Sequence, residues 1–259
     1  MSADSLISVI APAFNATAFY DAWLGSIQAQ GYPNLEVVLV DDGSTDNLRE
    51  LAQNGPSFLR YLRQDNRGPA AARNAGIAAS SGELIAFLDM DDLWVPGHLN
   101  RLAAALDGEP DFQMAQGLIR NFLYVDSRAF YCSLPYRFIN VGSFVFRRRV
   151  FDECGGFEES MRYAEDFDLI VRCWEQGMRK REIEELSLLY HRHETNMTSG
   201  KNLVEMGMVA IYKRHLDRLR AGKVKPMPEL LEVGYSEYIG HSVWPFDEGI
   251  REPVFADRK

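Results

Sequence analysis

The stretch that decides the fold is Phe87-Leu88-Asp89-Met90-Asp91-Asp92, a hydrophobic run that ends abruptly in three carboxylates. An earlier stretch, Val37-Val38-Leu39-Val40-Asp41-Asp42, has the same form. Each run is too apolar to face water on either side, which is typical of a buried strand. In open α/β sheets, ligands bind at the carboxyl ends of the strands. Carboxylates gathered there repel one another unless a cation or a ligand stabilises them, so the sequence indicates a divalent metal and a nucleotide-like partner.

Strands and helices alternate through the first hundred residues. The apolar runs predict strands at residues 6–11, 35–40, 58–62 and 84–88. The intervening segments predict helices at residues 17–30, 45–53, 69–80 and from 96 to about 107. This alternation predicts parallel βαβ units and a Rossmann-like, doubly wound and mostly parallel α/β sheet.

The pattern loosens from about residue 111, where a less regular half begins. Residues 141–147 alternate enough to predict a strand, and residues 164–175 predict a helix with one apolar face. A further amphipathic helix is expected at residues 202–220. The last stretch, 223–259, lacks clear periodicity, so a docked tail, a lid and an oligomer contact such as a homodimer all stay open.

Composition excludes several classes of function. The chain has 259 residues, 46% of them hydrophobic and 25% charged, which is ordinary for a soluble globular protein. Its net charge of -9 disfavours nucleic acid and anionic membranes as partners. No segment reaches the roughly 20 apolar residues that span a bilayer, and the first residues do not resemble a signal peptide. The three cysteines lack metal-like spacing, so we expect reduced thiols in a cytoplasmic protein that meets membranes only through a partner.

Two acidic pairs follow the predicted strands. Asp89 and Asp91 stand at i and i+2, so in an extended segment both side chains point to one side. Such oxygen ligands suit Mg²⁺ or Mn²⁺ bound together with substrate phosphates, and the alternative is a capped turn that starts a helix. Asp41 and Asp42 stand where a nucleotide base or ribose is held in this kind of fold, or they form an Asx-type turn with Gly43. The nucleotide contact and the turn are compatible, because the turn can position the carboxylate.

Three further sites each have both a functional and a structural interpretation. Arg73, one turn into a helix of small residues, either bridges to the aspartates, approaches a phosphate or forms an exposed salt bridge. Glu165-Asp166 starts a helix, where a carboxylate is a cap, a dipole partner or a general base. His191 and His193 share a face in an extended segment, and one of them is either a metal ligand or a structural histidine.

Taken together, five segments resemble family 2 glycosyltransferases of the GT-A fold, which are inverting enzymes that use nucleotide-activated sugars. The matching segments, in order, are Ser8-Val9-Ile10-Ala11-Pro12-Ala13-Phe14-Asn15, residues 40–46, residues 66–76, residues 87–92, and Gly155-Gly156-Phe157 followed by Glu165-Asp166. They span about residues 6–200. The resemblance implies one glycosyltransferase domain over residues 1–222, with a nucleotide-sugar-binding half at 1–110 and an acceptor-side half at 111–222.

The resemblance also assigns roles to individual residues. Around the base and ribose it places Pro12, Asn15, Asp41, Asp42 and Arg73, with Met90 and Asp89 completing the nucleotide site. Asp89 touches ribose or metal, and Asp91 ligates the metal that bridges the pyrophosphate. His193 falls where many relatives have a histidine near the diphosphate and is a further candidate ligand. Asp166 is the expected general base.

The activity implied is transfer of one sugar from a nucleoside diphosphate sugar to an acceptor hydroxyl, with Mn²⁺ or Mg²⁺ as cofactor. Uridine diphosphate is the default nucleotide, while guanosine and thymidine donors, the sugar and the acceptor stay open. The Gln-x-x-Arg-Trp signature of processive synthases is absent, which favours single-sugar addition. Three alternatives compete: a haloacid-dehalogenase-like phosphatase, a sugar-nucleotide pyrophosphorylase and a catalytically silent nucleotide-sugar-binding or scaffold module.

Overall fold

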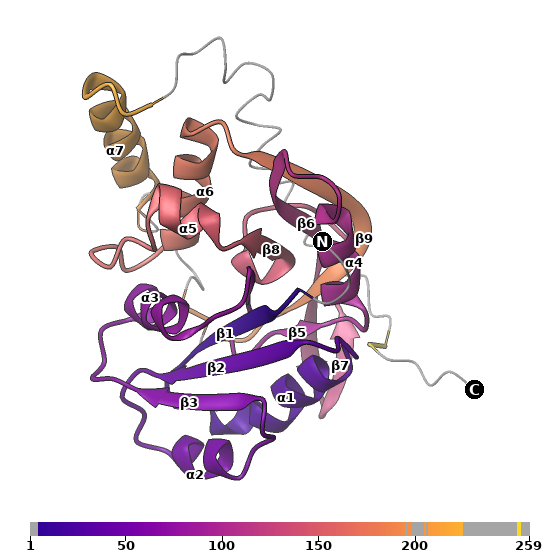
Figure 1. Cartoon of the computed structure of the whole chain (residues 1–259). Coiled ribbons are helices and arrows are strands. Elements are labelled where there is room, and N and C mark those ends of the chain that lie inside the picture. The colour runs from indigo at the N-terminus through magenta and orange to yellow at the C-terminus, as the bar shows by residue number, and fades with distance from the viewer. Residues whose placement is uncertain (1–4, 195, 198–204, 206, 225–252, 255–259) are drawn as a thin grey trace.

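The computed structural model describes residues 5–194, 196, 197, 205, 207–224, 253 and 254. Within these residues, nine strands form one sheet with helices on both faces (Figure 1). The strand order is β3-β2-β1-β4-β8-β6-β9-β5, and β7 pairs with β6. The predicted α/β fold class is confirmed.

The first half of the sheet is the predicted parallel part. Its strands are β1 (Ile7–Ala13), β2 (Leu35–Asp41), β3 (Leu59–Arg63) and β4 (Leu84–Phe87). Val9 of β1 lies opposite Val37 on one side and Ala86 on the other. Burial of β1, β2 and β4 on both faces explains why their sequences are continuous apolar runs rather than alternating ones.

The helices of this half agree with the sequence except at their ends. They are α1 (Tyr20–Gln28), α2 (Leu48–Gln53), α3 (Pro69–Ala79) and α4 (His98–Leu106). The predicted helix 17–30 divides into a 3₁₀ turn, η1 (Thr17–Phe19), and α1. The helix predicted from residue 96 begins later, because Gly97 takes a left-handed conformation with φ of 78°.

Helices on opposite faces of the sheet pack against different sets of strand residues. Buried side chains of α1, α2 and α4 share one apolar cluster with alternate residues of β1 and β2. On the opposite face, α3 packs on the sheet beside α5 (Arg149–Cys154), α6 (Glu165–Glu175) and α7 (Met208–Arg220), as Figure 1 shows. The predicted helix at residues 164–175 is therefore confirmed as α6.

The second half of the sheet contains one predicted strand, β8 (Phe144–Arg147), and four strands that the sequence did not reveal. These four are β5 (Leu93–Trp94), β6 (Phe112–Val125), β7 (Arg128–Tyr131) and β9 (Arg179–His191). The strand predicted at residues 141–147 is shorter, because residues 141–143 form a 3₁₀ turn, η2 (Val141–Ser143). β9 begins with four charged residues, of which Arg179, Arg181 and Glu182 stay exposed, so its first half carries no apolar signal.

The C-terminal region is described only in part. The helix expected at residues 202–220 is seen as α7, and residues 202–204 and 206 lie outside the described residues. Most of the tail predicted at 223–259 also lies outside them. Val254 donates its backbone N–H to the Ala129 carbonyl at 2.9 Å and packs with Phe122 and Leu189, so this part of the tail docks beside β7. Among the helices that the structure describes, none is long and apolar enough to cross a bilayer.

Gly76 of α3 sets how closely this helix lies on the sheet. A Cβ added there would overlap Ile10 Cγ2 of β1. We predict that Gly76→Ala lowers the free energy of unfolding by about 1–3 kcal/mol, measured by urea denaturation, because the core must shift to admit the methyl group.

The matched control is Gly25→Ala in α1, where an added Cβ meets no heavy atom within 4 Å. That change is expected to stabilise the protein by about 0.4–1 kcal/mol, because alanine restricts the unfolded chain. Equal effects of the two substitutions would contradict close packing at Gly76.

Candidate active site

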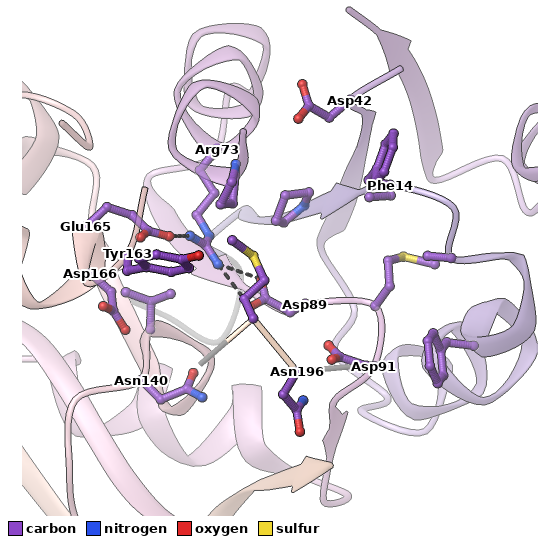
Figure 2. A pocket seen from close by; sticks show the side chains of 18 of the residues that line it. Phe14, Asp42, Arg73, Asp89, Asp91, Asn140, Tyr163, Glu165, Asp166 and Asn196 are labelled. Atoms are coloured by element: carbon purple, nitrogen blue, oxygen red, sulfur yellow. Dashed lines mark hydrogen bonds and ion pairs between the residues drawn. The ribbon is translucent and has the colours of Figure 1, made fainter. Parts of the chain in front are cut away.

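A cavity of about 500 Å³ opens at the carboxyl ends of β1, β2 and β4. Its lining combines the loop after β1, the acidic segment after β4, the start of α6 and the segment after β9. Figure 2 shows Phe14 and Asp42 on one side of this cavity, and Tyr163, Glu165 and Asp166 on the other. A volume of this size is typical of a small-molecule site.

The guanidinium of Arg73 lies at the centre of the site. It donates to both oxygens of Asp89, at 2.7 and 2.9 Å, and to Glu165 Oε1 at 2.5 Å (Figure 2). Arg73 is 5% exposed, so the exposed salt bridge considered as an alternative is not what forms. The two carboxylates raise its pKa further above the usual range, and the group stays charged.

Asp91 and His193 approach each other across the cavity. Asp91 Oδ2 lies 2.9 Å from His193 Nε2, and both side chains are partly exposed to the cavity. Asn196 fixes the histidine, because its Oδ1 accepts the His193 backbone N–H at 2.7 Å while its Nδ2 lies 3.0 Å from Nε2. Nε2 therefore faces an amide donor and a carboxylate acceptor together, and a single imidazole tautomer satisfies only one of them.

Asp166 lies in the first turn of α6 and has no ion pair with any described residue. Its Oδ1 accepts the Phe167 backbone N–H at 2.8 Å, and the side chain lines the cavity. Burial raises the pKa of Asp166 to about 7, and the adjacent charge of Glu165 acts in the same direction. The carboxyl is thus half-protonated near neutral pH.

Asp42 and Asn15 lie at the opposite end of the cavity, with Pro12 and Met90 also in its wall. The Asp42 carboxylate accepts the backbone N–H groups of Arg67 and Gly68, each at 2.8 Å. Asn15 Oδ1 accepts the Thr45 N–H at 2.8 Å, which joins the loops that follow β1 and β2.

Asp41 requires a correction. The sequence placed its side chain around the base and ribose, but this carboxylate is fully buried and does not line the cavity. It accepts from the Ser44 N–H at 2.7 Å, from the Tyr61 hydroxyl at 2.5 Å and from Arg63 at 2.6 Å. These bonds form the Asx-type turn that was the structural alternative, so Asp41 shapes the loop that carries Asp42.

Asp92 and His191 are also structural. The Asp92 carboxylate accepts the His191 backbone N–H at 2.9 Å, which ties the acidic segment after β4 to the end of β9. Burial raises the pKa of Asp92, and burial lowers that of His191 to about 4. His191 stacks on Phe122 at 4.8 Å between ring centroids and does not line the cavity.

Several lining residues escaped the sequence analysis as individual candidates. Phe14 is 52% exposed and lines the cavity. The others are Asn140, Arg162, Tyr163, Tyr190 and Asn196. Only Phe14 lay within a recognised motif, and its apolar neighbours on β1 concealed its exposure.

The amino-acid sequence was compared with models of known protein families. A sequence model described as glycosyl transferase family 2 matches residues 8–219. The chain belongs to this family. Family 2 membership sets aside the phosphatase and pyrophosphorylase alternatives.

Curated relatives match mainly through one segment. An uncharacterized glycosyltransferase of Nostoc sp. is 42% identical over 100 residues, which cover 37% of this chain and 31% of that protein. The Escherichia coli protein WfgD, named as a UDP-Glc:alpha-D-GlcNAc-diphosphoundecaprenol beta-1,3-glucosyltransferase, is 38% identical over 98 residues. That match covers 37% of this chain and 39% of WfgD. The matched segments thus span well under half of either relative.

Solved structures agree in fold and support the GT-A assignment. The S. aureus TarS 1–349 structure in complex with UDP-GlcNAc gives a TM-score of 0.63 at 21% identity, covering 76% of this chain and 62% of TarS 1–349. The mannosyltransferase PcManGT from Pyrobaculum calidifontis, in complex with GDP-Man and Mn²⁺, gives 0.60 at 21% identity. That likeness covers 88% of this chain and 68% of PcManGT.

The buried bridge of Arg73 yields a test of stability. We predict that Arg73→Met lowers the free energy of unfolding by about 3 kcal/mol at neutral pH, because Glu165 and Asp89 lose their counter-charge. Adding Glu165→Gln to Arg73→Met should recover part of this loss. Urea denaturation of the single and double variants measures both effects.

Arg67→Met is the control, since Arg67 pairs with Glu159 at 2.6 Å on the exposed surface. Its loss is expected to cost less than about 1 kcal/mol. A similar cost at both arginines would show that the buried bridge contributes no special stability.

The pKa of Asp166 yields a test of its titration. In the metal-free protein we predict an aspartate carboxyl that titrates with a midpoint near pH 7, observed by NMR with ¹³C-labelled aspartate. The group is protonated below this pH and becomes a carboxylate as pH rises through it. The resonance must disappear in Asp166→Asn, and a midpoint near 4 would contradict the assigned environment.

Proposed function

We propose that this family 2 member is an inverting glycosyltransferase that moves one sugar from a nucleoside diphosphate sugar, by default UDP-linked, to an acceptor hydroxyl. The observation that carries the proposal is the placement of the open Asp166 carboxylate across one cavity from the Asp91–His193 pair. One end of the cavity then suits a diphosphate, and the other suits a hydroxyl that must lose its proton.

The donor half supplies a site for the nucleoside. We assign the base to the region between Phe14 and Asp42, because an exposed aromatic face stacks well on a flat heterocycle. Asp42 has its carboxylate held in place by two backbone N–H groups, so it is oriented to accept further bonds. Residues 1–110 would bind the donor and residues 111–222 would contact the acceptor.

A divalent cation fits between Asp91 and His193. Adjacent ligands of an octahedral ion with bonds of about 2.0–2.1 Å lie about 3 Å apart, close to the observed 2.9 Å. A cation there would be bound by the Nε2 lone pair and the Asp91 carboxylate together, while the Asn196 amide keeps its bond to the His191 carbonyl at 3.1 Å. Asp89 is committed to Arg73, so Asp91 and His193 are the principal ligands, and no ready-made group of three ligands is found among the described residues.

The metal, Mn²⁺ or Mg²⁺, would supply neutralisation of the charge that builds on the departing nucleoside diphosphate. The chain itself supplies the base. Asp166, with a pKa of about 7, is a carboxylate in a large fraction of molecules at neutral pH and still basic enough to take a hydroxyl proton. Attack from the side opposite the leaving diphosphate inverts the anomeric centre in one displacement.

Two substitutions separate the metal site from the base. We predict that Asp166→Asn abolishes sugar transfer and leaves Mn²⁺-dependent binding of UDP near the wild-type level, because Asp166 lies across the cavity from Asp91, to which we assign the diphosphate. Asp91→Asn should instead weaken UDP binding in Mn²⁺ by about 10–100-fold. Thermal unfolding with UDP, GDP and dTDP and their sugars, with and without Mn²⁺, measures donor binding.

Each variant is the control for the other, since both remove one carboxylate charge from the same cavity. Transfer at near wild-type rate in Asp166→Asn would refute the base. An unchanged metal requirement in Asp91→Asn would refute the metal site. A wild-type protein that binds nucleotide but transfers no sugar would favour the alternative, a catalytically silent nucleotide-sugar-binding module.

A further inference from the structure

Arg162 and Tyr163 line the same cavity as Asp166 and have no role in the chemistry described above. They stand between Met161 and Phe167, each only 9% exposed and both in one apolar cluster. Ala164, a non-glycine residue with φ of 57°, turns the chain just before α6. Such strain persists only where the surroundings hold it in place, so the two side chains are presented by a fixed turn.

The charge balance around Arg162 is unusual. Its segment is acidic, yet all three of its glutamates have another cation as partner: Glu158 bonds to Arg214 at 2.7 Å, Glu159 to Arg67 at 2.6 Å and Glu165 to Arg73 at 2.5 Å. The fourth carboxylate, Asp166, accepts the Phe167 backbone N–H and lines the cavity. Within the part of the chain that the structure describes, Arg162 has the Tyr163 ring at 5.6 Å and forms no ion pair.

This guanidinium therefore retains its full capacity to bind an anion. Arginine is the side chain best suited to phosphate and carboxylate groups, because its planar fork donates two parallel hydrogen bonds. The ring of Tyr163 lies beneath it and favours the cation. Every other charged side chain that lines the cavity, apart from Arg73, is an acid or His193.

The position of Arg162 indicates that it would bind an anionic group of the acceptor rather than the diphosphate of the donor. Arg162 precedes Asp166 by four residues on the loop that leads into α6. Figure 2 shows Tyr163 beside Glu165 and Asp166, with Asp91 on the far side of the Arg73–Asp89 pair. The diphosphate site at Asp91 and His193 is therefore on the opposite side of the cavity from Tyr163.

We propose that Arg162 and Tyr163 form an acceptor subsite for a sugar that carries an anionic group, a phosphate or a carboxylate, close to the hydroxyl that is glycosylated. The anion pairs with Arg162 while the hydroxyl is directed to Asp166. This inference rests on the proposed glycosyltransferase function and adds the charge of its acceptor.

The test compares charged sugars with a neutral sugar built on the same ring. Wild-type protein loaded with UDP and Mn²⁺ is titrated with glucose 1-phosphate, glucuronic acid and methyl glucoside, and with the corresponding derivatives of galactose and N-acetylglucosamine. We expect one charged sugar to bind at least tenfold more tightly than its neutral counterpart, as expected for a hydrogen bond to a charged group. The phosphate and carboxylate series identify which anion is preferred.

Arg162→Met should reduce this preference to about twofold or less, and Arg162→Lys should retain part of it. Arg128→Met is the matched control, because Arg128 is exposed on β7 outside the cavity and its loss changes the net charge equally. UDP affinity is measured in parallel for every variant. A preference that survives in Arg162→Met, or falls equally in Arg128→Met, would overturn the subsite.

The outcomes also separate this inference from the proposed function. Wild-type protein that forms the UDP–Mn²⁺ complex but binds no charged sugar better than its neutral counterpart refutes the anionic subsite alone. Failure to form the nucleotide complex refutes the proposed function, and the acceptor subsite falls with it.

Discussion

The burial of one guanidinium group is the constraint on which the rest of the site depends. Arg73 is nearly inaccessible to water, and such a charge is tolerated only when carboxylates surround it. One of its partners, Asp89, follows β4, and the other, Glu165, starts α6, which is 92 residues further along the chain than Arg73. The bridge therefore fixes the donor side of the cavity relative to the acceptor side.

The bridge leaves an excess of negative charge in the cavity, and this charge affects the groups that carry out the proposed chemistry. Two carboxylates surround one guanidinium, so the central cluster keeps a net negative charge beside Asp91 and Asp166. Burial and Glu165 raise the pKa of Asp166 toward neutrality, where a carboxyl group can exchange a proton with a hydroxyl. On the other side of the cavity, Asp91 and His193 present an oxygen and a nitrogen ligand. A divalent cation bound there would neutralise part of the negative charge. An acid-rich cavity of this kind favours cations and protons over anions. The guanidinium of Arg162, which forms no ion pair with any residue that the structure describes, is therefore distinctive.

The sequence predicted the donor half well and the acceptor half poorly, for a physical reason. Strands such as β1 and β4 are buried on both faces, and their continuous apolar runs followed by acids are visible in a single sequence. β9 is different, since among the described strands its charged first half pairs with β6 alone. Asp41 and Asp42 are both buried, but only Asp42 lines the cavity. The sequence cannot show which of two adjacent aspartates faces the cavity before the geometry of the turn is known. Arg162 and Tyr163 lack a motif altogether, because their importance comes from a cavity that tertiary structure creates.

The pairing of β5 with β9 has a kinetic consequence. β5 contains only two residues, Leu93 and Trp94, and these pair with Leu189 and Leu188, so Asp91 precedes one end of the pairing while His193 follows the other. The two strands lie almost a hundred residues apart in sequence, whereas β1, β2 and β3 pair with strands that follow or precede them directly along the chain. Contacts between distant parts of a chain form late, because closing a long loop costs entropy before any contact repays it. During refolding, the nucleoside end of the cavity should therefore take shape before the cation site, and recovery of Mn²⁺ binding would report that the last strand has docked.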